Sequence, residues 1–242
     1  MSVNSTIDGG RIDRRLFAVA AIIFPLIVFA GFARTYYLKY FFDAPALPLL
    51  NHVHGMLMTT WVLLFVTQVW LISTRRIRTH QRLGFAAIGV AMLILIVGFL
   101  IATKTAKFGS PSSPGPVLRL QFLIIPLTDL LNFAILFTAA ILLRKRSADH
   151  KRLMLLTVVN FLPPAVARIP ISSLQSLGPL WFFGVSTTLA LIALIADWRF
   201  AGKMNKVFLI ATSLLIATFA LRPVFMGTVT WMCFAKWLTQ FQ

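Results

Sequence analysis

The sequence is poor in acidic residues and in cysteine, and both shortages narrow the chemistry open to it. Its 242 residues include no glutamate, six aspartates and one cysteine. The single Cys233 excludes an internal disulfide, and no Cys-x-x-Cys motif is present for metal binding or redox exchange. The sequence also contains no His-Glu-x-x-His motif, nucleophile elbow or paired carboxylates, so the commonest hydrolytic sites are absent.

The composition indicates a membrane protein. Hydrophobic residues form 59% of the chain and charged residues 12%, with a mean hydropathy of +0.86, whereas soluble domains are about 45–50% apolar and about 25% charged. A formal charge of +17 would suggest a nucleic-acid partner for a soluble protein. Because the basic residues here separate apolar runs, we expect them to set the topology in the lipid bilayer and to contact anionic lipid headgroups, with no nucleic-acid partner.

Seven apolar segments have the roughly 17–25 residues needed to cross a hydrocarbon core about 30 Å thick. They cover approximately residues 16–34, 53–74, 83–103, 119–143, 153–170, 178–197 and 206–222. The sequence therefore predicts an all-α fold, a polytopic transmembrane helix bundle of about seven spans, in a single domain over residues 11–242. Residues 1–10 are polar and are expected to be a disordered tail. Residues 223–242 are amphipathic, so they are expected to lie in the membrane interface or to form a short return helix.

The distribution of lysine and arginine predicts the orientation. Fifteen of the 23 Lys and Arg residues fall before the first span or in the turns that follow the second, fourth and sixth spans. By the positive-inside rule these segments are cytoplasmic. The N-terminus is therefore expected to be cytoplasmic and, with seven spans, the C-terminus is expected outside.

Two of the basic turns end in the same motif, seventy residues apart. The motif reads His-Gln-Arg-Leu at 80–83 and His-Lys-Arg-Leu at 150–153. The match suggests a duplicated helical hairpin, and a third hairpin after residue 178 keeps a basic turn without a histidine. Any hairpin with a cytoplasmic turn is expected to have basic residues there, so the shared charges are weak evidence for a duplication. The shared His-x-Arg-Leu motif is the stronger evidence.

His80 and His150 are the most chemically versatile residues at this membrane face. Each begins a helix and precedes an arginine, Arg82 or Arg152, so the helix dipole and the guanidinium groups both favour an anion. One interpretation is haem b, with two neutral imidazoles ligating one iron while the arginines pair with the propionates. A second is a phosphate site for a lipid headgroup or a nucleotide. A third is an amphipathic anchor without chemistry.

A further histidine, His54, lies near the start of the second span, in Asn-His-Val-His-Gly at 51–55. It precedes His80 by 26 residues, which is roughly 39 Å of helix. The two residues therefore belong to opposite membrane faces and cannot bind the same iron. His54 is expected to be a ligand at a separate site or a structural residue.

Asp129 is the costliest residue of the predicted bundle, because it lies near the middle of the fourth span. An isolated carboxylate there costs on the order of 3 kcal/mol, so it should be protonated or paired. Candidate partners are Arg168, Asn132 and Asn160, and we expect an Asp129–Arg168 pair. The resulting buried polar pocket is either a clasp between the fourth and fifth spans or a contact for a substrate, a proton or a cofactor.

The fifth span contains two adjacent prolines, Pro163 and Pro164. They remove two backbone donors, so the helix is expected to kink or break and to expose carbonyls that need partners. Broken helices are frequent where transporters build their sites, although tolerated proline kinks are also common. The break would lie beside the polar pocket predicted around Asp129.

Several of these residues together carry a family resemblance: His54, Gly55, Trp61, Gln68, His80–Gly84, Asp129 and His150–Leu156. With them, residues 50–240 resemble a group of uncharacterised bacterial polytopic inner-membrane proteins. The His-Lys-Arg-Leu-Met element at 150–154 is similar to one in small membrane proteins linked to cytochrome oxidase maturation, and the helix-and-histidine plan is similar to that of two-haem b-type cytochromes. The resemblance implies a bacterial inner membrane and a respiratory or haem-linked setting. That group usually has Arg-x-His in the third hairpin, where this chain has Lys-Met-Asn at 203–205.

Three classes of function follow. The first is a haem b-binding or respiratory-oxidase accessory protein, an electron-transfer component with His80, His150 and His54 as candidate ligands and a respiratory complex as its partner. The second is a small-solute or proton-linked transporter that uses Asp129 and Arg168. The third is a membrane-embedded enzyme acting on lipid, with the histidines at headgroup level. The first is the working hypothesis.

Overall fold

The computed structural model describes residues 3–109 and 115–241, and every regular element in this part of the chain is helical. The longer helices are α1 (Val3–Phe32), α2 (Leu49–Ser73), α3 (Ile77–Phe108), α5 (Ile124–Leu142), α6 (Ser147–Val159), α9 (Pro179–Ala201), α10 (Lys206–Phe225) and α11 (Val229–Gln240). The shorter elements are a π-helical turn η1 (Ala33–Tyr37), a 3₁₀ turn η2 (Lys39–Phe42), α4 (Pro116–Phe122), α7 (Pro163–Arg168) and α8 (Ser172–Gln175). The prediction of an all-α fold is confirmed.

Six helical segments in the described part are long and apolar enough to cross a membrane, which is compatible with an integral membrane protein. They are Arg15–Tyr37, Leu49–Ser73, Ile77–Phe108, Pro116–Leu142, Pro179–Ala201 and Lys206–Phe225. Six of the seven predicted spans therefore coincide with such a segment. The exception is the span predicted at 153–170, which the structure divides into α6 and α7.

Helix α1 begins at Val3 and so runs through most of the polar segment that we expected to be a disordered tail. Residues 1–2 of that segment lie outside the described residues. No proline interrupts the helix before the apolar run, since the first proline of α1 is Pro25. The polar residues at its start therefore extend the first helix instead of forming a separate tail.

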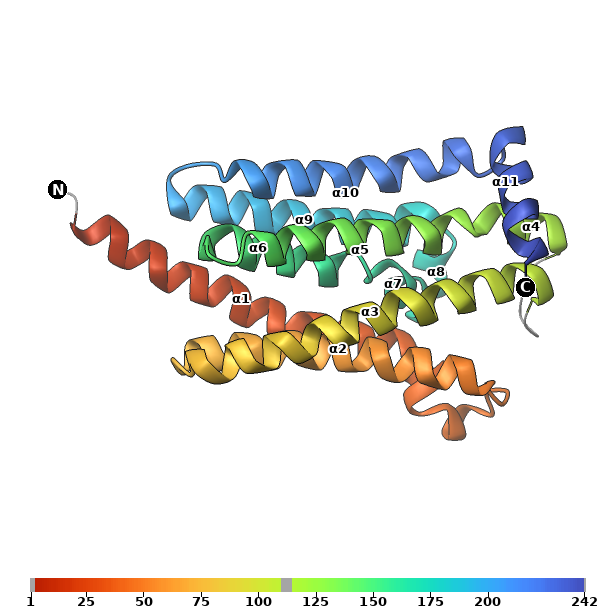
Figure 1. The fold of residues 1–242 in the computed structure, drawn as a ribbon, viewed down its shortest axis with the longest axis horizontal. Helices are drawn as coiled ribbons and strands as arrows, with labels where there is room; N and C mark the ends of the chain where they lie inside the picture. Colours follow the sequence, from red (N-terminus) through yellow and green to blue (C-terminus); the bar gives the residue numbers. More distant parts are fainter. Residues whose placement is uncertain (1–2, 110–114, 242) are drawn as a thin grey trace.

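Three helical hairpins have their tight turns at the same end of the bundle. The α2–α3, α5–α6 and α9–α10 turns lie at the left of Figure 1, together with the start of α1, while α4 and α11 lie at the right. These turns carry the basic residues singled out in the sequence. We call this end the basic end and the other the opposite end.

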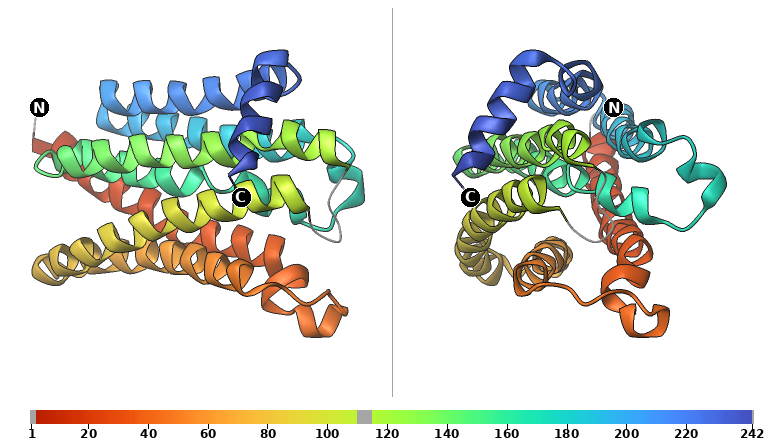
Figure 2. Two further views of the ribbon diagram at one scale, coloured as in Figure 1. Left: turned by 45° about the vertical axis from the view of Figure 1, so that its right-hand side comes forward. Right: turned by 90° about the vertical axis from the view of Figure 1, so that its right-hand side faces the viewer.

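Helix α6 lies in the middle of the bundle. It packs against α1, α2, α5, α9 and α10, and the end view in Figure 2 shows the long helices arranged around the bundle axis. Eight of its 13 residues are buried. Because protein surrounds α6 on most sides, its buried polar residues, which include Asp149 and Arg152, can find partners on neighbouring helices.

The break between α6 and α7 follows from Pro163 and Pro164. Proline carries no N–H, so the carbonyls one turn earlier lose their helical donors, and the chain turns at residues 160–162 before α7 begins. A neighbouring side chain supplies one donor to α7, since Trp181 Nε1 donates to the carbonyl of Val166 at 3.0 Å. The predicted helix break is present, and α9 helps to satisfy the backbone beyond it.

Helix α1 packs closely against α7 at Gly31. A Cβ added at Gly31 would overlap the backbone carbonyl of Ala165, a residue that is fully buried. Only glycine allows two backbones to approach so closely. This contact holds the segment after the break against the first helix.

The C-terminal helix α11 lies across the opposite end of the bundle, steeply inclined to α10 (Figures 1 and 2). Trp231 Nε1 donates to the carbonyl of Leu120 at 2.9 Å, which ties α11 to α4. Ala235 is buried on the inner side, whereas Phe234 and Trp237 are exposed. The placement of residues 223–242 relative to a membrane stays a prediction.

Candidate functional site

His80 and His150 lie next to each other at the basic end. Their ring centroids are 6.4 Å apart and the ring planes are inclined by 82°. His80 stands in the first turn of α3 and His150 in the first turn of α6, and both side chains are half-buried. The two copies of the sequence motif therefore meet where the first and second hairpins pack together.

The two rings differ in their hydrogen bonds. His150 Nδ1 lies 2.8 Å from the carbonyl oxygen of Ala140. A carbonyl only accepts, so this nitrogen carries the proton and Nε2 keeps a free lone pair. His80 Nδ1 is buried and has no hydrogen-bond partner among the described residues, while Gln68 Nε2 donates to the backbone carbonyl of His80 at 3.3 Å. A free imidazole lone pair, with the other ring nitrogen held by a carbonyl, is typical of metal-ligating histidines.

The two arginines of the motif have different surroundings, although their sequence contexts match. Arg82 is exposed. Arg152 is buried, with Nη2 at 2.5 Å from Asp197 Oδ1 of α9 and Nη1 donating to the carbonyl of Ala148. Arg152 is therefore committed to an internal ion pair, so the expectation that both arginines bind an anion holds at most for Arg82.

The third hairpin, which lacks a histidine, is joined to the second through Asn205. Its Nδ2 donates to Asp149 Oδ1 at 2.7 Å, and its Oδ1 accepts from the backbone N–H of Phe208 at 2.8 Å as the N-cap of α10. Together with the Arg152–Asp197 pair, this contact makes two polar ties from α6 to α9 and α10. The residue at this position in the third hairpin thus has a structural role.

Asp129 pairs with Arg222 of α10, so the predicted Asp129–Arg168 pair is wrong. Arg222 Nη2 lies 2.5 Å from Asp129 Oδ1, and both side chains are buried. The sequence reasoning missed Arg222 because the predicted seventh span ended at that residue, as if it marked the membrane boundary. The Pro-Val-Phe segment at 223–225 continues the apolar run beyond Arg222. This continuation could have indicated that Arg222 lies inside the span and not at its end.

The Asp129–Arg222 pair belongs to a larger polar centre beside the helix break. Asn160 Nδ2 donates to the backbone carbonyl of Asp129 at 2.8 Å, and Asn132 Nδ2 donates to Thr218 Oγ1 of α10 at 2.7 Å. The structure therefore brings together three of the four residues predicted to line the buried polar pocket. Arg168 is the exception, and Arg222 takes its place.

The guanidinium of Arg222 lies between two aromatic rings. Its Cζ is 5.1 Å from the ring centroid of Phe183 and 4.7 Å from that of Phe219. Arg222 Nε and Nη1 and Asn160 Oδ1 are buried without a hydrogen-bond partner among the described residues. Because unpaired buried donors and acceptors are costly, this centre has hydrogen-bonding capacity for water or for a small polar ligand.

Helix α2 begins and α7 ends toward the opposite end (Figure 1), so His54 and Arg168 lie away from the basic end. The guanidinium of Arg168 packs over Phe32, with Cζ 5.0 Å from the ring centroid. His54 stands near the start of α2, a full helix away from the turn that leads to His80. This placement agrees with the prediction that His54 and His80 cannot bind one iron.

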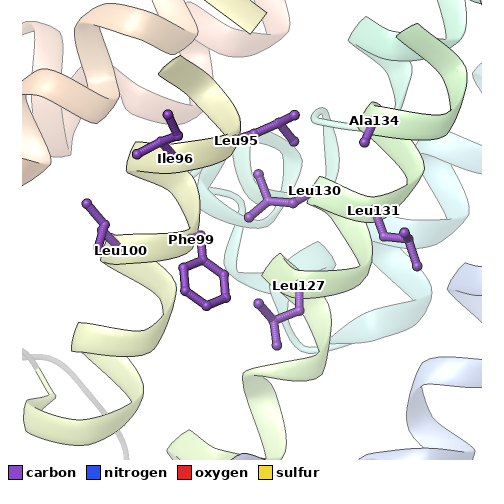
Figure 3. Close-up of a pocket in the computed structure, with 8 residues that line it drawn as sticks. All are labelled: Leu95, Ile96, Phe99, Leu100, Leu127, Leu130, Leu131 and Ala134. Atoms are coloured by element: carbon purple, nitrogen blue, oxygen red, sulfur yellow. The ribbon is translucent and has the colours of Figure 1, made fainter. Parts of the chain in front are cut away.

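An apolar groove of about 490 Å³ lies between α3 and α5 (Figure 3). Its lining residues are Leu95, Ile96, Phe99, Leu100, Leu127, Leu130, Leu131 and Ala134. The groove contains none of the candidate site residues, and its side chains carry no polar group. It therefore suits hydrocarbon and offers no chemistry.

Within the described residues, no group of three or more His, Cys or Asp side chains could hold a metal ion. A metal ion bound by protein alone usually takes three or four ligands, whereas haem iron receives four from its own macrocycle. The His80–His150 pair supplies two imidazole ligands. Comparisons with protein-family models, curated proteins and solved structures found no match, so the family resemblance carried by the motifs stays a prediction.

Proposed function

We propose that the protein is a haem b-binding, electron-transfer component of a bacterial inner membrane, in which His80 and His150 would hold the haem iron. The observation that supports it most is the 6.4 Å between the two ring centroids. Imidazole nitrogens bind a metal at about 2.0–2.1 Å, so two rings on opposite sides of one iron have centroids about 6 Å apart. The distance between the two rings matches this spacing.

The surrounding residues have matching roles in this proposal. The Ala140 carbonyl orients the His150 ring and makes its free nitrogen a better ligand. Gly84, one turn after His80, leaves room, since the nearest side-chain atom to an added Cβ is Gln68 Nε2 at 4.0 Å. Arg82 is the motif arginine available to a propionate. When bound, haem supplies one-electron transfer, and a respiratory complex is the expected partner.

We infer that the basic end faces the cytoplasm and that α6 and α7 together form a seventh, discontinuous crossing. Fifteen of the 23 basic residues are in the segments that would then be inside. Single cysteines in place of Ser73 and Ser176, in a Cys233→Ser background, should be labelled from opposite sides by a membrane-impermeant thiol reagent. Labelling of both from the same side contradicts this topology.

The proposed haem site is tested by the visible spectrum of the protein purified in detergent from haem-sufficient cells. A b-type spectrum that changes on reduction with dithionite is expected, with haem at one per chain by pyridine haemochrome assay. His80→Ala and His150→Ala should each remove most of the bound haem, because each removes one axial ligand. His52→Ala, at the opposite end, is the matched control and should leave the spectrum unchanged.

Two outcomes contradict the haem proposal. One is a colourless wild-type protein from haem-sufficient cells, including a protein that carries zinc or copper in place of haem. The other is a b-type spectrum that survives the double variant His80→Ala, His150→Ala. Thermal unfolding of each variant distinguishes loss of haem from loss of the fold.

A second candidate function, a proton-linked or small-solute transporter, is favoured by one observation, the unpaired donors of Arg222 beside the helix break. With Arg222 in place of Arg168, the buried pair with Asp129 would be the transport site. Proton flux into proteoliposomes under an imposed potential tests it. Asp129→Asn should abolish the flux, while Asn132→Ser should retain it, and no flux in the wild type removes the proton-linked form of this candidate.

A further inference from the structure

The turn between α2 and α3 holds an arginine in a conformation that normally belongs to glycine. Arg75 has a φ of 57°, in the left-handed region. Its N–H donates to the carbonyl of Ile72 at 3.1 Å, and the N–H of Arg76 donates to the carbonyl of Leu71 at 2.8 Å. These two bonds form the Schellman motif, which closes the C-terminus of a helix and usually has glycine at the position that Arg75 occupies.

The chain uses a better suited residue at the corresponding place in the third hairpin. There Gly202 ends α9 with a φ of 69°. The one other described non-glycine residue with a positive φ is Asp43, and aspartate tolerates this region because its short side chain can bond locally. For Arg75 the conformation is costly, because the Cβ of an L residue comes close to the following carbonyl oxygen. Strained backbone of this kind is typical of functional sites.

The side chains of this turn form an exposed cationic surface. Arg75, Arg76 and Arg78 are all exposed, and among the described residues no carboxylate forms an ion pair with them. Arg76 lies over the ring of Trp70, with Cζ 5.0 Å from the ring centroid. Thr74 Oγ1 donates to the carbonyl of Trp70 at 2.9 Å. The aromatic ring and the first two arginines therefore belong to one closed turn.

The aspartates described at this end are committed to contacts inside the bundle. Asp149 accepts a hydrogen bond from Asn205, and Asp197 pairs with Arg152. Both aspartates are buried. Neither is available to the arginines of the α2–α3 turn.

The same turn also exposes large apolar side chains. Trp70, Ile72 and Ile77 are each about half exposed, beside the arginines. Tryptophan is enriched at the boundary between hydrocarbon and headgroups, where arginine can keep its stem in apolar surroundings and its charge in water. This mixture suits a lipid surface better than the acidic face of a protein.

We propose that the α2–α3 turn binds the phosphate of an anionic phospholipid headgroup, with Arg75 and Arg76 as the principal contacts. Guanidinium groups offer forked donors that match phosphate oxygens. An anionic headgroup fits better than a zwitterionic one, which carries its own cation to pair with the phosphate. This proposal is independent of haem, because Arg82, the arginine available to a propionate, takes no part in it.

Titration of phosphatidylglycerol into the protein in detergent, followed by microscale thermophoresis, tests the contact. Arg75→Gly should weaken binding about fivefold, the contribution of one basic residue near an anionic lipid surface. The same variant should raise the melting temperature without lipid by about 2–4 °C, because glycine adopts the left-handed conformation without the clash. Arg75→Lys keeps both the charge and the strain, so it should bind within about twofold of the wild type and melt at the same temperature.

The charge-matched control is Lys145→Gly in the α5–α6 turn, where Lys145 is exposed and no described residue has a positive φ. It should leave lipid binding unchanged and should not raise the melting temperature. Phosphatidylcholine should bind more weakly than phosphatidylglycerol, and equally to the wild type and to Arg75→Gly. The haem spectrum should be the same in all of these variants.

Three outcomes overturn the lipid proposal. The first is an Arg75→Gly variant that binds phosphatidylglycerol as tightly as the wild type, whatever its melting temperature. The second is an equal loss of binding in Lys145→Gly, which would mean that the basic end acts only through its total charge. The third is a polyglutamate peptide that binds more tightly than phosphatidylglycerol with the same dependence on Arg75, which would assign the turn to a protein partner.

Discussion

The two copies of the repeated hairpin, α2–α3 and α5–α6, show how one motif can have different consequences at two places in a bundle. The arginine of the motif is exposed in α3 at Arg82 but only 5% exposed in α6 at Arg152. The leucine that follows is half-buried at Leu83 but buried at Leu153. The histidine is half-buried in both, and there the two copies meet.

The difference follows from the position of each helix. Helix α3 has neighbours on part of its surface and exposes large apolar side chains such as Met92 and Ile96, so a charged side chain near its end can extend into water. Helix α6 is packed against five helices, so each of its charges needs a partner. Substitutions at matched positions of the two hairpins should therefore have unequal effects.

The largest effect is expected for the motif arginines. Arg152→Ala leaves Asp197 buried without its partner, which should lower the free energy of unfolding by about 3–5 kcal/mol. Arg82→Ala, at the matched position, removes an exposed charge and should cost less than about 1 kcal/mol. Unfolding of both variants in detergent, followed by circular dichroism, measures the difference. Equal losses would mean that the two hairpins are equivalent after all.

The next effect concerns close helix packing. Gly31→Ala forces α1 away from the carbonyl of Ala165, so we expect a loss of about 1–3 kcal/mol in the free energy of unfolding. Gly89→Ala in α3 meets nothing within 4 Å, and its higher helix propensity should leave stability unchanged or raise it by up to about 1 kcal/mol. Thermal unfolding compares the two. A stable Gly31→Ala variant would show that α7 is free to move.

A smaller effect is expected at the tie between the second and third hairpins. Asn205→Ala removes the N-cap of α10 and the hydrogen bond to Asp149, and should cost about 1–2 kcal/mol. Thr228→Ala removes the N-cap of α11, where Oγ1 accepts from the backbone N–H of Trp231 at 3.3 Å, and should cost less. Equilibrium unfolding of both in one detergent ranks them, and a reversed order would argue against the tie.

The smallest effect is expected for single hydrogen bonds between helices. Asn132→Ala, which breaks the bond to Thr218, should cost about 0.6 kcal/mol, the typical value for such bonds in membrane proteins. Gln68→Ala breaks the longer bond to the His80 carbonyl in the first hairpin and should cost no more. A double-mutant cycle with Thr218→Ala measures the first interaction. A coupling energy near zero between Asn132 and Thr218 would mean that ion pairs alone, without this hydrogen bond, stabilise the second hairpin.

Much of the fold could be predicted, because its signals are local. Apolar length predicted six of the helical segments, and Pro163 and Pro164 predicted where the central helix breaks. The repeat suggested that His80 and His150 share one membrane face, and the structure places them together. These results need no knowledge of which helices are neighbours.

The partners of the buried charges could not be predicted in the same way. Asp129 was expected to need a cation, but the choice between Arg168 and Arg222 depends on which helix faces meet. Arg152 was assigned to an anion site on the strength of its resemblance to Arg82, and its partner Asp197 lies on another hairpin. Ion pairs between helices that are distant in the sequence cannot be recognised from the spacing of residues along the chain.

The sequence by itself determined that this chain is helical, that its apolar segments are long enough for a membrane, and that its basic turns alternate with them. These are properties of hydrophobic length and charge order, which each segment carries alone. The tertiary structure decided that the broken segment lies in the middle, that Asp129 meets Arg222, and that the His80 ring lies beside the His150 ring. Such contacts depend on how helix faces pack, because a buried charge or an unpaired imidazole is stabilised by whichever group the neighbouring helix presents.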